Sequence, residues 1–232
     1  MPRVSNYVLV HGAFVGGSIW RETAALLEKD GHRVDVVEQL PSAGTDRATL
    51  GDLQADVEVV TRAVEAVGQP VVLVGHSYGG MVLTELADHP AVTHAVYLAA
   101  FWPQRGQSAM DLLGGGPLPD WLVLRDDEGT LELIDDLEVR RQVECGDVDP
   151  ERAAEYLGRM VPQSVSSFAA PSTAPDGRHP TTYIICDQDQ ALPPPAQEQW
   201  AGAADHVEHL PSSHQAMVSM PDELARLLVR VS

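Results

Sequence analysis

The sequence is poor in basic residues. Its 232 residues contain 15 Lys and Arg against 34 Asp and Glu, which gives a formal net charge of −19. A chain this acidic is repelled at long range by nucleic acid and by anionic lipid, so neither is expected as a partner. The same repulsion disfavours coenzyme A thioesters and acidic carrier domains, and it favours a neutral or weakly polar small-molecule substrate.

The sequence also lacks long hydrophobic runs, and no apolar segment approaches the roughly 20 residues that cross a bilayer. The apolar run in "NYVLV" (6–10) is too short for the core of a signal peptide, so we interpret it as a strand and expect a cytoplasmic protein. The two cysteines, Cys145 and Cys186, are far apart and have no metal-ligand neighbours, so we expect both to be reduced and buried. No metal and no organic cofactor is expected.

Short β-prone segments alternate with longer amphipathic ones, which is the pattern of β-α-β units around a mostly parallel sheet. Most of the short segments are apolar throughout, as in strands that are covered on both faces. The predicted strands are 6–10, 34–38, 71–74, 94–99, 181–186 and 206–210. The predicted helices are about 18–30, 50–67, 79–88, 196–203 and 217–230. The length is compatible with one domain.

The alternation is interrupted between about 103 and 178. This stretch combines a Gly/Pro-rich loop, a hairpin-like pair of β-prone runs around "RDDEGT" and a capped helix in "DPERAAEYLGRM". Because the stretch departs after the fourth strand, we interpret 103–178 as a lid over the carboxyl edge of the sheet. The core is then formed by 1–102 and 179–232. The alternative is an extra subdomain with no role at a site.

A single serine stands at a Gly-rich corner in "VVLVGHSYGGMV" (71–82). The corner fits G-x-S-x-G as Gly75-His76-Ser77-Tyr78-Gly79, with a strand before it and a helical pattern after it. Such a sharp strand-to-helix turn exposes the serine hydroxyl at the edge of the sheet, and bulky side chains two positions away would clash. The sequence therefore predicts that Ser77 is a nucleophile. His76 is assigned no role.

A serine nucleophile needs a base that is oriented by an acid, and in this topology the order along the chain is Ser, acid, His. His214 lies on the loop after the last strand and is the predicted base. Asp187 and Asp189 both follow the fifth strand. Asp189 lies further into its loop and has more freedom to reach the imidazole, so we predict it as the acid, with Asp187 as the alternative.

The backbone N–H groups of Ala13 and Tyr78 are the predicted oxyanion donors, because the loops after strands one and three meet where strand order reverses. Four residues on the converging loops are candidates for an apolar substrate pocket, and each could instead belong to the core: Phe14, Trp121, Leu192 and Met217. The loop "HGAFVGG" lacks the G-x-G-x-x-G spacing of a dinucleotide site, which disfavours that alternative.

Four segments together resemble the α/β-hydrolase superfamily: "YVLVHGAFVGGSIW", "VGHSYGGM", "CDQDQALP" and "SSHQAMVSMPDELARLL". The nearest branch resembles the salicylate-binding methyl esterases, polyneuridine aldehyde esterase and their relatives, the hydroxynitrile lyases. The resemblance implies a six-stranded α/β-hydrolase fold with a lid and a triad at Ser77, Asp189 and His214. The lyases carry a threonine in the first loop and a lysine after the catalytic histidine. Here Gly12-Ala13 and Gln215 occupy those places, so the esterase side of the branch is favoured.

We therefore expect a serine esterase that cleaves a small, neutral and largely apolar carboxylic ester, such as a methyl ester. The alternatives left open are hydrolysis of a carbon–carbon bond, a tailoring hydrolase or cyclase of secondary metabolism, a thioesterase, and a ligand-binding protein with a vestigial triad. A homodimer is also left open.

Overall fold

The main sheet forms the centre of the molecule. A computed structural model describes residues 4–231, and its main sheet has the strand order β2-β1-β3-β4-β8-β9 with parallel pairing throughout. The strands are β1 (Asn6–Val10), β2 (Arg33–Val36), β3 (Val71–His76), β4 (Val92–Leu98), β8 (Thr181–Cys186) and β9 (His206–Leu210). The six predicted strands are confirmed. Strand order reverses at β1 and β3, so the loops that follow these two strands lie next to each other.

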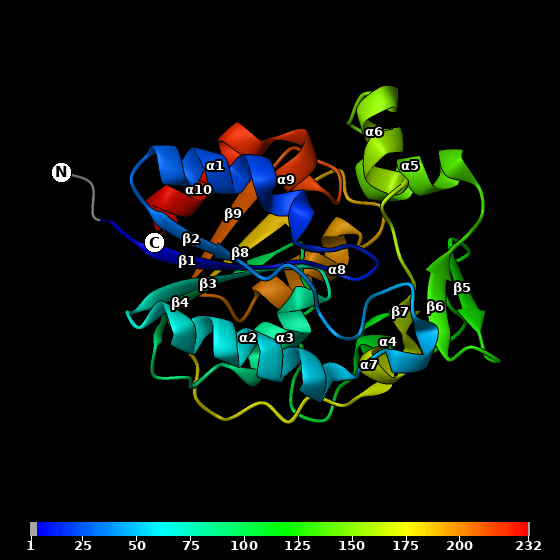
Figure 1. The fold of residues 1–232 in the computed structure, drawn as a ribbon, viewed down its shortest axis with the longest axis horizontal. Coiled ribbons are helices and arrows are strands. Elements are labelled where there is room, and N and C mark those ends of the chain that lie inside the picture. Colours follow the sequence, from blue (N-terminus) through cyan, green and yellow to red (C-terminus); the bar gives the residue numbers. More distant parts are fainter. Residues whose placement is uncertain (1–3, 232) are drawn as a thin grey trace.

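Helices cover both faces of this sheet (Figure 1). One layer contains α1 (Arg21–Lys29), α9 (Ala216–Ser219) and α10 (Pro221–Val231), and the other contains α2 (Leu53–Val67), α3 (Gly79–Glu85) and α8 (Pro194–Ala201). Two short 3₁₀ helices lie in the loops after β1 and β2, namely η1 (Gly17–Trp20) and η2 (Arg47–Thr49). An apolar cluster lies on each face of the sheet. Cys145 and Cys186 are free and buried, as predicted.

Capping residues explain where two predicted helices differ from the observed ones. The helix predicted to begin at 50 begins at Leu53, because the Asp52 carboxylate accepts a hydrogen bond from the Ala55 N–H at 3.0 Å and ends the extended segment before it. The helix predicted over 217–230 is divided into α9 and α10. Pro221, the first residue of α10, has no N–H to continue the preceding turn.

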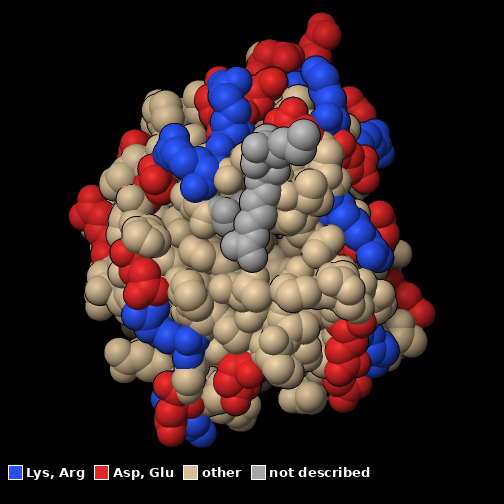
Figure 2. All heavy atoms as spheres, turned by 90° about the vertical axis from the view of Figure 1, so that its left-hand side faces the viewer, with Lys and Arg blue, Asp and Glu red and all other residues tan. Residues whose placement is uncertain are grey.

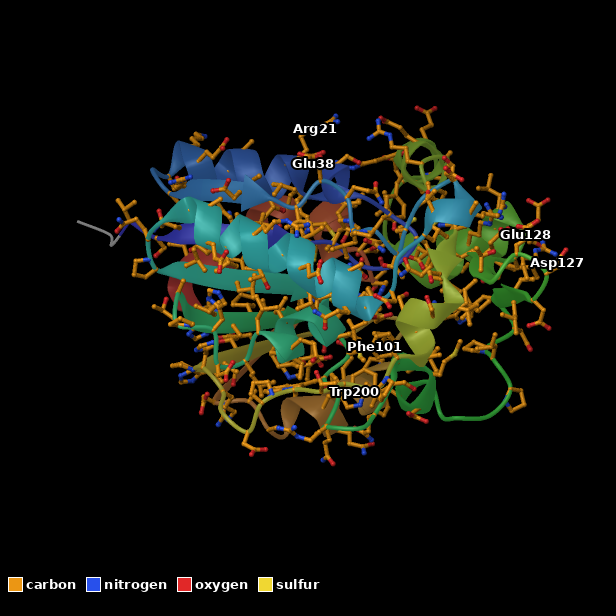
Figure 3. All side chains as sticks on the ribbon, turned by 60° about the horizontal axis from the view of Figure 1, so that its bottom comes forward. Arg21, Glu38, Phe101, Asp127, Glu128 and Trp200 are labelled. Atoms are coloured by element: carbon orange, nitrogen blue, oxygen red, sulfur yellow. The ribbon has the colours of Figure 1, made fainter. Side chains whose placement is uncertain are left out.

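Between β4 and β8 the chain leaves the main sheet. Its elements there are α4 (Ala109–Leu112), β5 (Leu122–Arg125), β6 (Thr130–Leu133), α5 (Leu137–Cys145), α6 (Pro150–Leu157), β7 (Gln163–Ser164) and α7 (Val165–Ala169). The predicted hairpin is the antiparallel pair β5-β6, and Asp127 and Glu128 lie at its outer end (Figure 3). Helix α6 is capped by Asp149, whereas α5 was not predicted. The domain boundaries at 102/103 and 178/179 stay a prediction.

Segment 161–164 attaches this part of the chain to the core. The Ser164 N–H donates to the Ser42 carbonyl at 2.7 Å, and the Val161 N–H donates to the Phe14 carbonyl at 2.8 Å. Gln163 is fully buried between them, and its side-chain amide donates to the hydroxyls of Ser42 and Ser167 at 2.7 and 2.8 Å. The loops after β1 and β2 are thus tied to the segment that ends at α7.

The face of the molecule opposite α5 and α6 shows how the charge is distributed. Figure 2 shows basic side chains beside acidic ones around the margin of this face and a largely uncharged centre. No helix in the described part of the chain is long and apolar enough to cross a membrane.

Gln163→Leu should lower the free energy of unfolding by about 2 kcal/mol, because buried polar partners lose their hydrogen bonds. Urea unfolding followed by circular dichroism measures this loss. The matched control is Gln199→Leu on the exposed surface of α8, which should change the stability by no more than about 0.5 kcal/mol. Equal stability of the two variants would show that Gln163 is not a structural anchor.

Candidate active site

Ser77 lies at the turn between β3 and α3. Its φ of 53° falls in the left-handed region, which a non-glycine residue rarely adopts. The turn is fixed by its backbone: the Ser77 N–H donates to Leu98, and its carbonyl accepts from Gly80 and Phe101. A strained backbone that the surrounding structure holds in place is typical of a nucleophile elbow.

The two motif glycines allow this turn to form. A Cβ atom on Gly75 would lie 2.5 Å from a Leu83 methyl carbon and 3.0 Å from the backbone of Gly79. A Cβ atom on Gly79 would lie 2.9 Å from the His11 carbonyl oxygen. The separations of 2.5 and 2.9 Å are shorter than real Cβ contacts, so the steric reason predicted for the motif holds in the structure.

His214 and Asp189 form a buried pair at the ends of β9 and β8. The distance from His214 Nδ1 to Asp189 Oδ2 is 2.7 Å, and the side chains are 4% and 0% exposed. A carboxylate only accepts, so Nδ1 carries the proton and Nε2 is left free to act as a base. Burial lowers the pKa of His214, but the charges of Asp189 and Glu144 outweigh it and raise this pKa overall.

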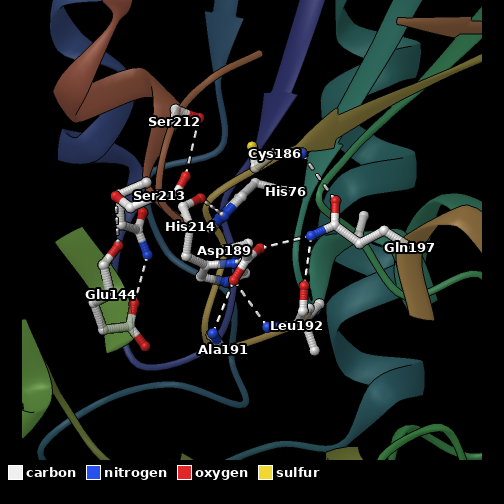
Figure 4. Close-up of polar contacts among 12 residues, drawn as sticks. His76, Glu144, Cys186, Asp189, Ala191, Leu192, Gln197, Ser212, Ser213 and His214 are labelled. Atoms are coloured by element: carbon white, nitrogen blue, oxygen red, sulfur yellow. Dashed lines mark hydrogen bonds and ion pairs between the residues drawn. The ribbon is translucent and has the colours of Figure 1, made fainter. Parts of the chain in front are cut away.

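Asp187, the alternative acid, is directed elsewhere. Its carboxylate lies 2.7 Å from Nδ1 of His209, and both side chains are about half exposed. Asp189 also accepts hydrogen bonds from Ala191 and Leu192 N–H groups and from the Gln197 amide (Figure 4). The structure therefore brings Asp189, and not Asp187, to His214.

The predicted oxyanion donors, Ala13 and Tyr78, follow β1 and β3. Among residues 4–231, neither backbone N–H has a protein acceptor. Ala13 lines the cavity described below, while Tyr78 is fully buried beside Ser77 and is not among the lining residues. The Tyr78 hydroxyl donates to Asp56 at 2.8 Å, and burial raises the pKa of that carboxyl to about 6. This contact holds Tyr78 in place, the residue directly after Ser77 whose N–H is a predicted oxyanion donor.

Ser77 and His214 line the same cavity. Apolar side chains form most of its wall, and the predicted pocket residues Phe14, Trp121 and Leu192 are among them. The remaining lining residues were not predicted: Phe101, Leu113, Leu122, Glu144, Phe168 and Ala191. Of these, Phe101 lies in the loop after β4 and packs against Trp200 (Figure 3). Its place after the carboxyl end of a strand could have indicated a pocket residue from the sequence. No sequence signal marked Glu144 in α5 or Phe168 in α7 as pocket residues.

The prediction that Met217 lines this pocket is wrong. Met217 is buried on the opposite side of the loop that carries His214. There it contributes to a second cavity together with Val15 and Ile19. The reason is that α9 begins at Ala216 and packs against η1, which directs Met217 toward the layer that contains α1.

His76 holds the loop between β9 and α9 (211–215), which carries His214 and is called the His214 loop below. Its Nε2 lies 3.0 Å from the His214 carbonyl oxygen, and the two rings are 4.5 Å apart between centroids (Figure 4). A carbonyl only accepts, so Nε2 is the protonated nitrogen. Burial lowers the pKa of His76 well below its usual value, so the ring stays neutral beside His214. The sequence analysis missed this positioning role.

No group of three or more His, Cys, Asp or Glu side chains within residues 4–231 is arranged to hold a metal ion. A serine hydroxyl and an imidazole lie in the wall of this cavity, and the imidazole contacts the Asp189 carboxylate behind it. This is the constellation of acyl transfer.

Residues 7–227 match the family described as "Alpha/beta hydrolase family". The chain is 33% identical to the carbendazim hydrolyzing esterase of Nocardioides sp. over 97% of this chain and 98% of that protein. It is 26% identical to salicylic acid-binding protein 2 of Nicotiana tabacum over 100% and 98% of the two chains. The crystal structure of a pyrethroid hydrolase from Sphingobium faniae superposes with a TM-score of 0.84 at 27% identity, covering 98% of this chain and 97% of that one.

The chain therefore belongs to the alpha/beta hydrolase family. The family and the branch that its motifs resemble are confirmed.

Proposed function

We propose that the protein is a serine hydrolase that cleaves a small, neutral and largely apolar carboxylic ester. The observation that carries this proposal is the buried contact between Asp189 and His214 at the edge of the cavity that Ser77 also lines. The strain at Ser77 and the two unpaired N–H groups support it. The side chain that follows His214 is the uncharged Gln215, which offers no cation for a departing cyanide.

The reaction has two halves. Ser77 Oγ attacks the ester carbonyl while its proton moves to His214 Nε2, and the oxyanion accepts hydrogen bonds from the N–H groups of Ala13 and Tyr78. Each donor stabilises the transition state by about 3 kcal/mol. The tetrahedral intermediate expels the alcohol, which takes the proton from Nε2. Water then attacks the acyl-enzyme, loses a proton to Nε2, and the acid leaves as Ser77 regains that proton.

The walls of the cavity support an apolar substrate. Phe14, Trp121 and Leu192 offer apolar contacts, and relatives are named for hydrolysis of carbendazim and of pyrethroids. We propose that residues 103–178 act as a lid, since Trp121 and Phe168 reach the cavity from that segment. The cytoplasmic location, the absence of a cofactor and a homodimer remain predictions.

Ser77→Ala should lower the hydrolysis of a 4-nitrophenyl short-chain ester by about 10⁴-fold or more, because the nucleophile is lost. Release of 4-nitrophenolate measures the rate. Equal rates for the two proteins would exclude Ser77 as the nucleophile. If the wild type is inactive but a fluorophosphonate labels Ser77, the site is competent and the proposed substrate class is wrong.

Asp189→Asn should lower kcat/KM by about 10³-fold or more, because the amide no longer holds the imidazole in the required tautomer. Asp187→Asn is the matched control, since its carboxylate contacts the exposed His209 and points away from His214. It should retain activity within about twofold. The reverse order of the two variants would reassign the acid of the triad.

The pH profile should report the pKa of His214, which acts as a base only when it is neutral. Since that pKa lies above its usual value of 6.5, kcat/KM should be constant in alkaline solution and fall about tenfold per pH unit below a midpoint above 6.5. Glu144→Gln removes one of the charges that raise the pKa, so its midpoint should lie at lower pH. A profile that stays flat down to about pH 4 would exclude His214 as the base.

A further inference from the structure

Glu144 is an unexpected residue in the wall of the catalytic cavity. It lies in the last turn of α5, is 4% exposed, and lines the cavity together with Ser77 and His214. The other lining side chains, apart from Ser77 and His214, are apolar or aromatic. A substrate held by apolar contacts therefore meets one carboxyl group that the proposed acyl transfer does not use.

The neighbours of Glu144 occupy one side of its carboxyl group. The Gln215 side-chain amide donates to Oε2 at 2.7 Å, and the Tyr156 hydroxyl donates to the same oxygen at 3.3 Å. The Glu144 carbonyl accepts from the Gln215 N–H at 3.1 Å, which fixes the backbone of α5 against the His214 loop. Figure 4 shows Glu144 beside Ser213 of this loop. The side chain is held in place from two directions.

The other carboxyl oxygen, Oε1, has no protein donor. Among residues 4–231, Gln215 and Tyr156 are the donors to this side chain, and both reach Oε2. Burial raises the pKa of Glu144, while the nearby His214 and the Gln215 amide lower it in part. Glu144 lines the cavity, and a bound molecule that displaces water from Oε1 without supplying a donor leaves this carboxyl oxygen unsatisfied.

We propose that Oε1 of Glu144 accepts a hydrogen bond from an N–H or O–H group on the acyl part of the substrate. This inference rests on the proposed ester hydrolase function and narrows its substrate class to largely apolar esters that carry one hydrogen-bond donor. We assign the donor to the acyl part because that part stays on the enzyme in both halves of the reaction. Glu144 is thus a specificity-determining residue.

Oε1 of Glu144 lets the site discriminate between substrates that carry a hydrogen-bond donor and analogues that lack it. A site built to accept a hydrogen bond rejects an analogue that lacks the donor, since the buried group is then left unsatisfied. The apolar wall by itself separates such analogues weakly, because their shapes are nearly equal. The ratio of rates for a matched pair of substrates therefore isolates the contribution of Glu144.

The experiment uses the methyl esters of 2-, 3- and 4-hydroxyphenylacetic acid, each paired with its fluoro analogue, at pH 8.5. Chromatography of the released acid gives kcat/KM. For the best-placed hydroxyl, the wild type should prefer the donor ester by about tenfold or more. Three positions are tested because the direction of approach to Oε1 sets which hydroxyl reaches it.

Glu144→Gln should abolish or invert this preference. The introduced amide keeps its oxygen on the donors from Gln215 and Tyr156, so its NH₂ group takes the place of Oε1 and donates instead of accepting. Glu138→Gln is the matched control, because it removes a carboxylate from the exposed side of the same helix. It should leave the ratio unchanged. A ratio also cancels any uniform effect of Glu144 on the pKa of His214.

Each outcome decides between the two proposals. Hydrolysis of both members of every pair within about twofold overturns the role of Glu144 and leaves the esterase function standing. A preference that survives Glu144→Gln overturns it too, because another group must then read the donor. If neither the methyl esters nor a 4-nitrophenyl ester is cleaved, the esterase function fails and this inference falls with it. If Glu144→Gln does not fold, equal hydrolysis of both members of every pair by the wild type still overturns the role of Glu144.

Discussion

The buried hydrogen bond between Asp189 and His214 joins the ends of β8 and β9, and the loop after β8 is organised around it. A carboxylate removed from water must be surrounded by donors. Here the imidazole, two backbone N–H groups and the Gln197 amide supply them. Gln197 also accepts from the Cys186 N–H at 3.1 Å, so α8 is tied to the last residue of β8. The position of the base is thus set by the packing of the sheet.

On the other side of His214, a buried polar atom of His76 lacks a hydrogen-bond partner among the described residues. His76 donates to the His214 carbonyl, but Nδ1 of His76 is buried and has no partner within residues 4–231. Such an orphaned acceptor costs about 1 to 3 kcal/mol. The backbone of Ser77 is strained beside it, and Oε1 of Glu144 lacks a protein donor nearby. Unfavourable local features that gather at one cavity are expected where a structure is built for function as well as for stability.

The sequence analysis anticipated the geometry where local chemistry and topology act together. Parallel strands place the loops after β1, β3, β8 and β9 at one edge, so the contact of Asp189 with His214 and the cavity shared by His214 and Ser77 could be expected from motif and chain order. The walls of the cavity could not be chosen in this way. Phe168 and Glu144 reach the site from helices whose positions depend on tertiary packing, and α5 was not predicted at all. Met217 was misplaced because the side to which a short helix turns depends on what it packs against.

The core and the inserted segment contribute different parts of the site, and Glu144 connects the two. His214 and Asp189 lie on loops of the main sheet, whereas several apolar walls come from between β4 and β8. Glu144 belongs to the second group, yet its charge raises the pKa of His214. One carboxyl group of the inserted segment therefore faces the cavity and acts on the imidazole at the same time.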